Sequence, residues 1–265
     1  MAQAAAGATR QFELDLSAIP SQDQERAWQV YLRLRASQPF RPVAYGRYFR
    51  GASGVALQYW YLYLYNDFVN NHEGDWEMAV LELGPDEGPL RAGYSAHHGG
   101  SRMDWDRAPK DGPRPLLYVA KGSHAGYFAY RPEGHPAIKL RRMVNYPLIS
   151  AVAAWLGLRW LTPSRGLPAL RRLRDYPPAD PALDSWAPPE VKGLRLDPEL
   201  RILPGSASGG PPVAGVDSKW WWLRYQGRWG SSRPRLTGTV GPEGPWCQGQ
   251  RWSDPIAWLA GLGEA

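Results

Sequence analysis

Residues 72 to 77 read HEGDWE and open a stretch that is otherwise typical of a buried strand. A strand alternates its side chains between two faces, so Asp75 and Glu77 share one face and stand about 7 Å apart. Two carboxylates at that distance can act as a coupled acid and base, or can bind one divalent metal ion through a bridging water. Because a buried carboxylate without a partner is costly, we expect a cation beside them. The candidates are His72, His98, His124, Lys121, Arg102 and a metal ion.

All five histidines fall between residues 72 and 135. They flank predicted strands: His72 precedes the strand 75–83, His97 and His98 end the strand 93–98, and His124 follows the strand 115–121. If these strands pair in an antiparallel manner, their histidine ends meet at one edge of the sheet, where the strand before Asn66 also ends. The sequence therefore predicts one site at that edge. Its candidate catalytic residues are His72, Asp75, Glu77, His98, Lys121 and His124; its candidate substrate-binding residues are Asn66, Trp76, His97 and Ser123; its candidate metal ligands are His72, Asp75 and Glu77.

Two other interpretations fit the same residues. A buried polar network that fixes the packing of the strands would also place histidines beside carboxylates. Ser123 and His124 in KGSHAG could form a nucleophile and its base, but residues adjacent in sequence rarely present both groups correctly, so we disfavour that pair.

The remaining composition predicts the framework. With 14 Trp, 14 Tyr, 29 Gly and 26 Pro, the chain favours short strands and turns over long helices. We predict a single domain over residues 1–265 that is mainly β, a β-sandwich or jelly-roll-like fold. Its β core would comprise residues 43–130 and 219–258, preceded by a helix at 22–36. Residues 141–215, apolar and then rich in arginine and proline, would form a helical or irregular cap, with a helix at 146–160.

Charge and cysteine content limit which ligands and which cellular compartment we expect for this protein. The net charge is +6, but the arginines are scattered, so we do not expect nucleic acid to bind. Cys247 is the single cysteine, which excludes an intramolecular disulfide and a zinc site built on thiolates, and favours the reducing cytoplasm. The N-terminus lacks a secretory signal pattern, and the apolar run 146–163 is too short to span a bilayer. Residues 146–174 could still lie on a membrane surface.

Several stretches resemble the Vps62 (vacuolar protein sorting-associated protein 62) family. They are YWYLYLYND, HEGDWEMAVLEL, YSAHHGG, RPLLYVAKGSHAGYF and, late in the chain, GRWG with GPEGP. The resemblance covers roughly residues 43–130 and 219–246. It implies a β-rich domain and little about chemistry, because the family name records a sorting phenotype. It marks His72, Gly74, Asp75, Trp76, Glu77, His98, Gly122, Ser123, His124 and Ala125.

The convergence of titratable groups favours an enzyme. A hydrolase could use a divalent metal ion that lowers the pKa of bound water. A metal-free form would use Asp75 or Glu77 as general base or acid, with His124 or Lys121 stabilising charge on the substrate. A lyase or cyclase could act on an apolar substrate, because a wall of Trp and Tyr stabilises cations. The alternatives without catalysis are a module that binds a glycan or lipid, and a peripheral membrane or sorting factor that docks through residues 146–174.

Overall fold

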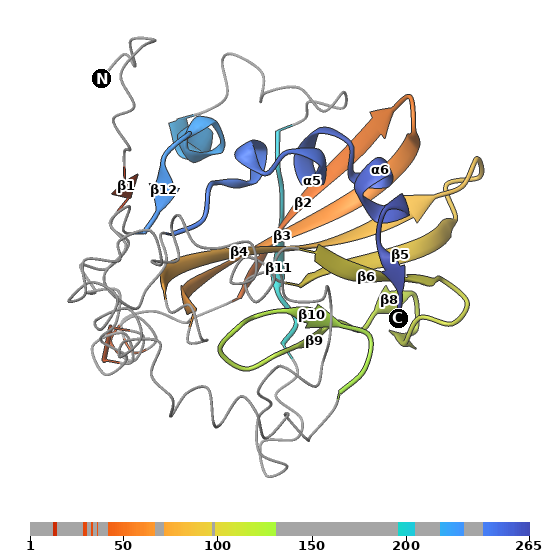
Figure 1. Ribbon diagram of the computed structural model, residues 1–265, viewed down its shortest axis with the longest axis horizontal. Coiled ribbons are helices and arrows are strands. Elements are labelled where there is room, and N and C mark those ends of the chain that lie inside the picture. The colour runs from red at the N-terminus through yellow and green to blue at the C-terminus, as the bar shows by residue number, and fades with distance from the viewer. Residues whose placement is uncertain are drawn as a thin grey trace, which may run out of the picture.

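The computed structural model describes residues 13–14, 29–30, 33, 36, 42–66, 72–96, 99–130, 196–204, 218–230 and 241–265. These residues are mainly β, as predicted, and most of the strand residues belong to one large sheet (Figure 1). The four described residues within the predicted helix 22–36 are helical. The predicted helix 146–160, and the cap 141–215 apart from residues 196–204, lie outside the described residues.

The large sheet has seven strands in the order β11-β2-β3-β4-β5-β6-β13. Its centre is an antiparallel meander whose members follow one another in sequence: β2 (Val43–Gly51), β3 (Gly54–Asn66), β4 (His72–Leu83), β5 (Pro89–Ala96) and β6 (Gly99–Asp104). The edge strands β11 (Glu199–Ile202) and β13 (Gly263–Glu264) are each parallel to their neighbour. Residues 196–204, predicted as part of the cap, therefore belong in part to the sheet.

One face of the sheet carries an aromatic core. On β4 this face bears Trp76 and Met78, as the alternation of the strand predicts. Opposite them lie short elements from the C-terminal part of the chain (Figure 1): η4 (Ser218–Arg224), β12 (Arg228–Trp229), η5 (Pro245–Cys247), α5 (Gln250–Ser253) and α6 (Pro255–Ala260). The buried members of this cluster are Trp60, Trp76, Met78, Leu203, Leu223, Trp229 and Trp252. Burial of these large rings supplies much of the hydrophobic stabilisation of the fold.

The C-terminal elements differ from the prediction. The aromatic stretch KWWWLR predicts a strand, but it forms the 3-10 helix η4. Its tryptophans pack on the sheet instead of extending it, so tertiary contacts outweigh local propensity. Helix α6 begins at Pro255, and the side chain of Asp254 accepts a hydrogen bond from the amide of Ala257, so this segment is helical where a β core was expected.

The opposite face of the sheet carries Leu57, Ala79 and Leu81. Residues from the segment 105–128 pack on it. This segment contains two short antiparallel pairs: β7 (Lys110–Asp111) pairs with β8 (Arg114–Pro115), and β9 (Tyr118–Val119) pairs with β10 (Gly126–Tyr127). A further pair joins β1 (Glu13–Leu14) to β12. In the part of the chain that the structure describes, no helix has the length and apolar character needed to cross a bilayer.

Gly230, the last residue of GRWG, packs against the backbone of β4. It has a φ of 100°, and a Cβ atom built on it would lie 2.2 Å from the carbonyl oxygen of Glu73. The late motif is therefore in direct contact with HEGDWE.

We expect Gly230→Ala to lower the free energy of unfolding by about 2–3 kcal/mol, because it adds a steric clash to an unfavourable backbone conformation. Gly112→Ala is the matched control, since Gly112 also has a positive φ but has open space around the position of its Cβ. Urea denaturation measures both. Equal losses would show that the contact with Glu73 does not constrain the fold.

Candidate functional site

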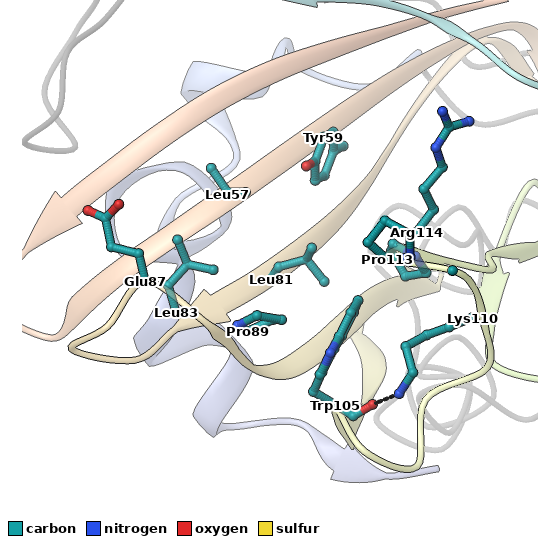
Figure 2. A pocket seen from close by; sticks show the side chains of 12 residues that line it. Leu57, Tyr59, Leu81, Leu83, Glu87, Pro89, Trp105, Lys110, Pro113 and Arg114 are labelled. Carbon is teal, nitrogen blue, oxygen red and sulfur yellow. Dashed lines mark hydrogen bonds between the residues drawn. The ribbon is translucent and has the colours of Figure 1, made fainter.

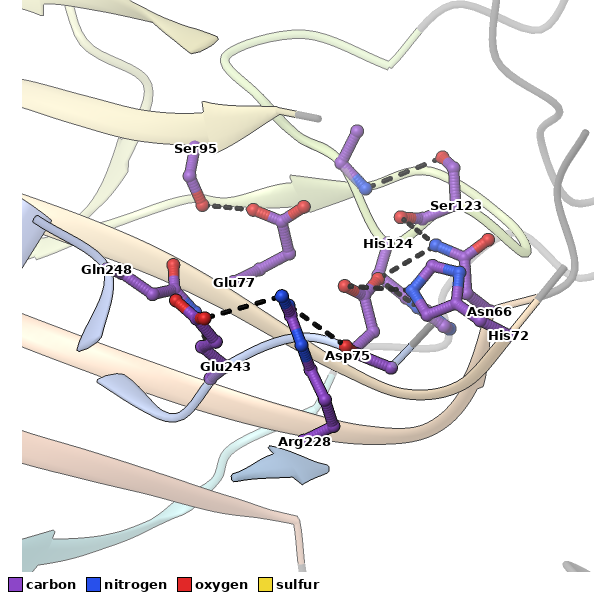
Figure 3. A network of polar contacts seen from close by, with 12 residues as sticks. Asn66, His72, Asp75, Glu77, Ser95, Ser123, His124, Arg228, Glu243 and Gln248 are labelled. Atoms are coloured by element: carbon purple, nitrogen blue, oxygen red, sulfur yellow. Dashed lines mark hydrogen bonds and ion pairs between the residues drawn. The ribbon is translucent and has the colours of Figure 1, made fainter. Parts of the chain in front are cut away.

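Asp75 and His124 form a hydrogen-bonded pair at the end of the sheet where β4 begins (Figure 3). The distance between Asp75 Oδ2 and His124 Nδ1 is 3.0 Å. The side-chain amide of Asn66 donates to the same oxygen at 2.9 Å and to the carbonyl of Ser123 at 3.3 Å. The ends of β3 and β4 meet here, as their predicted antiparallel pairing requires. Residues 115–121, predicted as a further strand of this sheet, contribute instead the short strand β9, which pairs only with β10 in a separate sheet, and the loop 120–125 brings His124 to the same end.

The loop KGSHAG holds His124 in an uncommon conformation. The amide of His124 donates to the carbonyl of Ala120 at 3.1 Å, and the amide of Ala120 donates to the carbonyl of Ala125 at 2.9 Å. His124 has a φ of 60°, and Gly122 a φ of 88°. A non-glycine residue in this region costs free energy, and such strain clusters at functional sites. The turn directs the imidazole back onto the sheet.

A positive φ at Gly74 brings His72 into the same cluster. In a regular strand, residues three apart point to opposite faces. The φ of 71° at Gly74 interrupts the alternation of β4, and His72 Nε2 lies 3.9 Å from Asp75 Oδ1. Both oxygens of Asp75 therefore face an imidazole.

Tyr63 forms one wall of the site. Its ring stacks on the imidazole of His124, with centroids 4.0 Å apart and planes 4° from parallel. Burial raises the pKa of Tyr63 well above its usual value, and the nearby phenol of Tyr61 and the carboxylates of Glu77 and Asp75 raise it further. The phenol therefore stays protonated over the whole neutral range and can donate a hydrogen bond.

Glu77 lies on the same face of β4 but has a different partner. Its carboxylate accepts a hydrogen bond from the hydroxyl of Ser95, and the Ser95 oxygen accepts from the amide of Met78 at 2.6 Å. Both Glu77 and Ser95 are buried. The two carboxylates of HEGDWE thus share a face, as predicted, and they differ in environment.

The charge of Asp75 is stabilised by the histidines. Burial alone would raise the pKa of this carboxyl group, but the hydrogen bonds with His124 and His72, and the charges of those imidazoles, outweigh it and hold the pKa well below the usual range. Asp75 is therefore ionised at neutral pH and acts only as an acceptor.

This shift gives a pH dependence of stability. A carboxyl group whose pKa is lower in the folded state contributes stability above its unfolded pKa of about 3.9, and that stability is lost as the pH falls through the folded pKa. We expect the wild type to lose stability below about pH 4 more steeply than Asp75→Asn. Urea denaturation at a series of pH values measures the difference. If the free energy of unfolding fell equally steeply with pH in both proteins, the ionised form of Asp75 would not stabilise the fold.

The other predicted residues lie in several places. Ser123 is buried and contributes its carbonyl oxygen to the Asn66 contact. Lys121 is exposed. The guanidinium of Arg102, a candidate cation, donates to the carbonyl of Ala260. His97 and His98 lie outside the described residues.

Trp76 is a correction to the predicted substrate-binding set. It lies on the opposite face of β4 from Asp75, and its ring is stacked on Trp222 at 5.6 Å and set edge-on to Trp229 at 5.1 Å. The alternation of the strand, which places Asp75 at the site, places the next residue in the aromatic core.

Among the described residues, no three His, Cys, Asp or Glu side chains are arranged to hold a metal ion. The predicted ligands His72, Asp75 and Glu77 differ in their contacts, because both histidines approach Asp75 whereas Glu77 bonds to Ser95. Any metal site would need groups beyond this arrangement.

Sequence reasoning missed Tyr63 and Ser95. Tyr63 is paired with Asp75 across β3 and β4, so a correct register of the YLYLY stretch would have identified it. Ser95 is the second-last residue of β5, and nothing in its local sequence indicates a carboxylate partner.

No family model and no curated protein sequence matches this chain. Among solved structures, NLPPya in complex with glucosamine shares 20% identity and a TM-score of 0.30, over 33% of this chain and 46% of the other. Necrosis and Ethylene inducing Protein 2, from the causal agent of Witches Broom disease of cocoa, shares 22% identity and a TM-score of 0.29, over 33% and 45%. The chain spans less than half the length of either structure.

Proposed function

We propose that this protein is an acid–base enzyme in which His124 transfers the proton and Asp75 orients it. The observation that carries the proposal is the 3.0 Å contact between His124 Nδ1 and an aspartate that stays ionised. Because Asp75 only accepts, Nδ1 must donate, and the lone pair of the neutral ring then lies on Nε2. A histidine oriented in this way is the usual general base of acyl and proton transfer.

The surroundings support a catalytic assignment over a purely structural one. The side chain of His124 is 15% exposed, so its ring is accessible from solvent while its orientation is fixed by Asp75 and Tyr63. The neutral phenol of Tyr63 lies near both carboxylates and can donate to an oxygen on which charge develops. In the reaction, Nε2 would take a proton from water or from the substrate and return it to the leaving group.

Two reaction classes fit these groups. A hydrolase would use Nε2 to activate water, and a lyase or cyclase would use it to remove a proton from the substrate itself. A metal-assisted form is tested by elemental analysis of protein purified without added metal, where stoichiometric zinc, manganese or calcium would support it. We retain the β-sandwich description, the likeness to the Vps62 family and a cytoplasmic location as parts of this proposal.

A panel of chromogenic esters, glycosides and phosphates, together with β-hydroxy acid substrates for elimination, tests the proposal with wild type and His124→Gln. We expect any activity found to be lost in His124→Gln and kept in Arg107→Gln, which removes an exposed cation outside the candidate site. Activity that persists in His124→Gln would refute the assignment of His124 as the base.

A further inference from the structure

A groove of about 490 Å³ lies on the same face of the sheet as the candidate site, farther along β3 and β4 (Figure 2). Its floor comes from the large sheet and its outer wall from Trp105 and the β7–β8 hairpin. The volume falls within the roughly 300–1,000 Å³ typical of sites for small molecules. The lining residues are Leu57, Tyr59, Leu81, Leu83, Glu87, Pro89, Trp105, Lys110, Gly112, Pro113, Arg114 and Pro115.

The floor of the groove is apolar. Leu57, Leu81 and Leu83 line it, and register pairing sets Leu57 directly opposite Leu81. Tyr59 and Trp105 contribute aromatic surface beside these leucines (Figure 2). A floor of this kind favours an aliphatic or aromatic body over a sugar, which would need several hydrogen-bonding groups along its length.

The two ends of the groove differ in charge. Glu87 stands at one end, where its carboxylate is matched by the guanidinium of Arg50 at 3.3 Å. Lys110 and Arg114 stand at the other end (Figure 2). That end therefore carries two cations beside an apolar floor.

These cations are only partly compensated. The ammonium of Lys110 donates to the carbonyl oxygens of Trp105 and Asp106, and in the described part of the chain no carboxylate lies within ion-pair distance of it. An ammonium has three donors, so one is left for a ligand. Arg114 pairs with Asp197 at 3.4 Å, but both side chains are well exposed, and such pairs contribute little.

We propose that this groove binds a single amphipathic anion, a molecule with an apolar chain and a terminal carboxylate. The chain lies on Leu57, Leu81 and Leu83, and the carboxylate is bound by Lys110 and Arg114. The inference goes beyond the proposed function and does not depend on it. Tyr59 in the groove and Tyr63 at His124 are four residues apart on one face of β3, about 13 Å at the rise of a strand, so the two sites are separate.

Calorimetric titration with decanoate, below its micelle concentration, tests the proposal, with decyltrimethylammonium as a probe of the same chain and opposite charge. We expect decanoate to bind and the cationic probe to bind at least about tenfold more weakly, as expected when a charged hydrogen bond is replaced by repulsion. Absence of decanoate binding, or equal binding of both probes, would overturn the proposal.

Two variants locate the binding. Arg114→Gln should weaken decanoate about tenfold, the effect of losing one hydrogen bond to a charged group. Arg201→Gln is the matched control, because Arg201 is also exposed and paired, with Glu199 at 2.9 Å, but does not line the groove. Equal affinities of these two variants would overturn the assignment of the anion to this end.

Leu57→Trp, the filling variant, places a bulkier side chain in the groove and should reduce decanoate binding. Leu83→Trp is a second filling variant for use if the first does not fold. Vesicles of phosphatidylcholine and phosphatidylglycerol test whether the groove binds the apolar chains and anionic headgroups of a membrane instead of a free molecule. The vesicles could retain the wild type but not the filling variant while decanoate fails to bind. That result would overturn the proposal of a free ligand and show that the groove binds a lipid surface.

Discussion

Replacing Trp76 by alanine is expected to lower the free energy of unfolding by about 3–5 kcal/mol, the range for removing a large aromatic side chain from a core. Trp76 is 2% exposed and contacts the rings of Tyr45, Trp222 and Trp229. Its removal leaves a cavity beneath η4 and β12 that these rings can fill only in part. Urea or thermal denaturation followed by circular dichroism measures the loss.

Trp221→Ala is the control for Trp76→Ala. Trp221 is the sequence neighbour of Trp222, which packs on Trp76, but its own side chain is 56% exposed, so we expect its truncation to change stability by less than about 1 kcal/mol. Trp76→Phe keeps an aromatic ring and should fall between the two. If Trp76→Ala were as stable as Trp221→Ala, Trp76 would not be a core residue.

The faces of β4 follow directly from its sequence. Alternation separates Asp75, Glu77 and Leu81 from Trp76 and Met78, and the structure places Leu81 in one buried cluster and Trp76 with Met78 in the other. The approach of Asn66 to Asp75 also follows from the pairing of consecutive strands, whereas His124 reaches Asp75 from a loop after β9, which is not a strand of the large sheet. The faces of β4 and the approach of Asn66 depend on short-range periodicity, which a single sequence records.

Contacts that depend on backbone irregularities did not follow from the sequence. His72 reaches Asp75 only because Gly74 has a positive φ, and a glycine by itself does not reveal which φ it adopts. The choice of Ser95 as the partner of Glu77 depends on how β5 lies beside β4 at its end. The helical form of KWWWLR depends on the sheet that it covers.

Replacing Asp75 by asparagine should reduce the turnover of a substrate found for this protein by roughly 10³–10⁴-fold, as in other enzymes whose histidine loses its orienting aspartate. Asparagine has nearly the same shape, but its amide nitrogen cannot accept the Nδ1 proton of His124, so the imidazole is left in the wrong tautomer or orientation. Asp75 acts here as a positioning residue.

Glu77→Gln is the matched control for Asp75→Asn, because it removes a carboxylate from the same face of β4 that accepts a hydrogen bond from Ser95. A merely structural role for Asp75 would reduce stability and turnover together, whereas a positioning role reduces kcat in a folded protein and shifts the pH profile. Nitrogen chemical shifts of His124 report its tautomer directly, and we expect protonation at Nδ1 in the wild type to be lost in Asp75→Asn. A wild type protonated at Nε2 would contradict the geometry on which the enzyme proposal depends, whatever the activity of the variants.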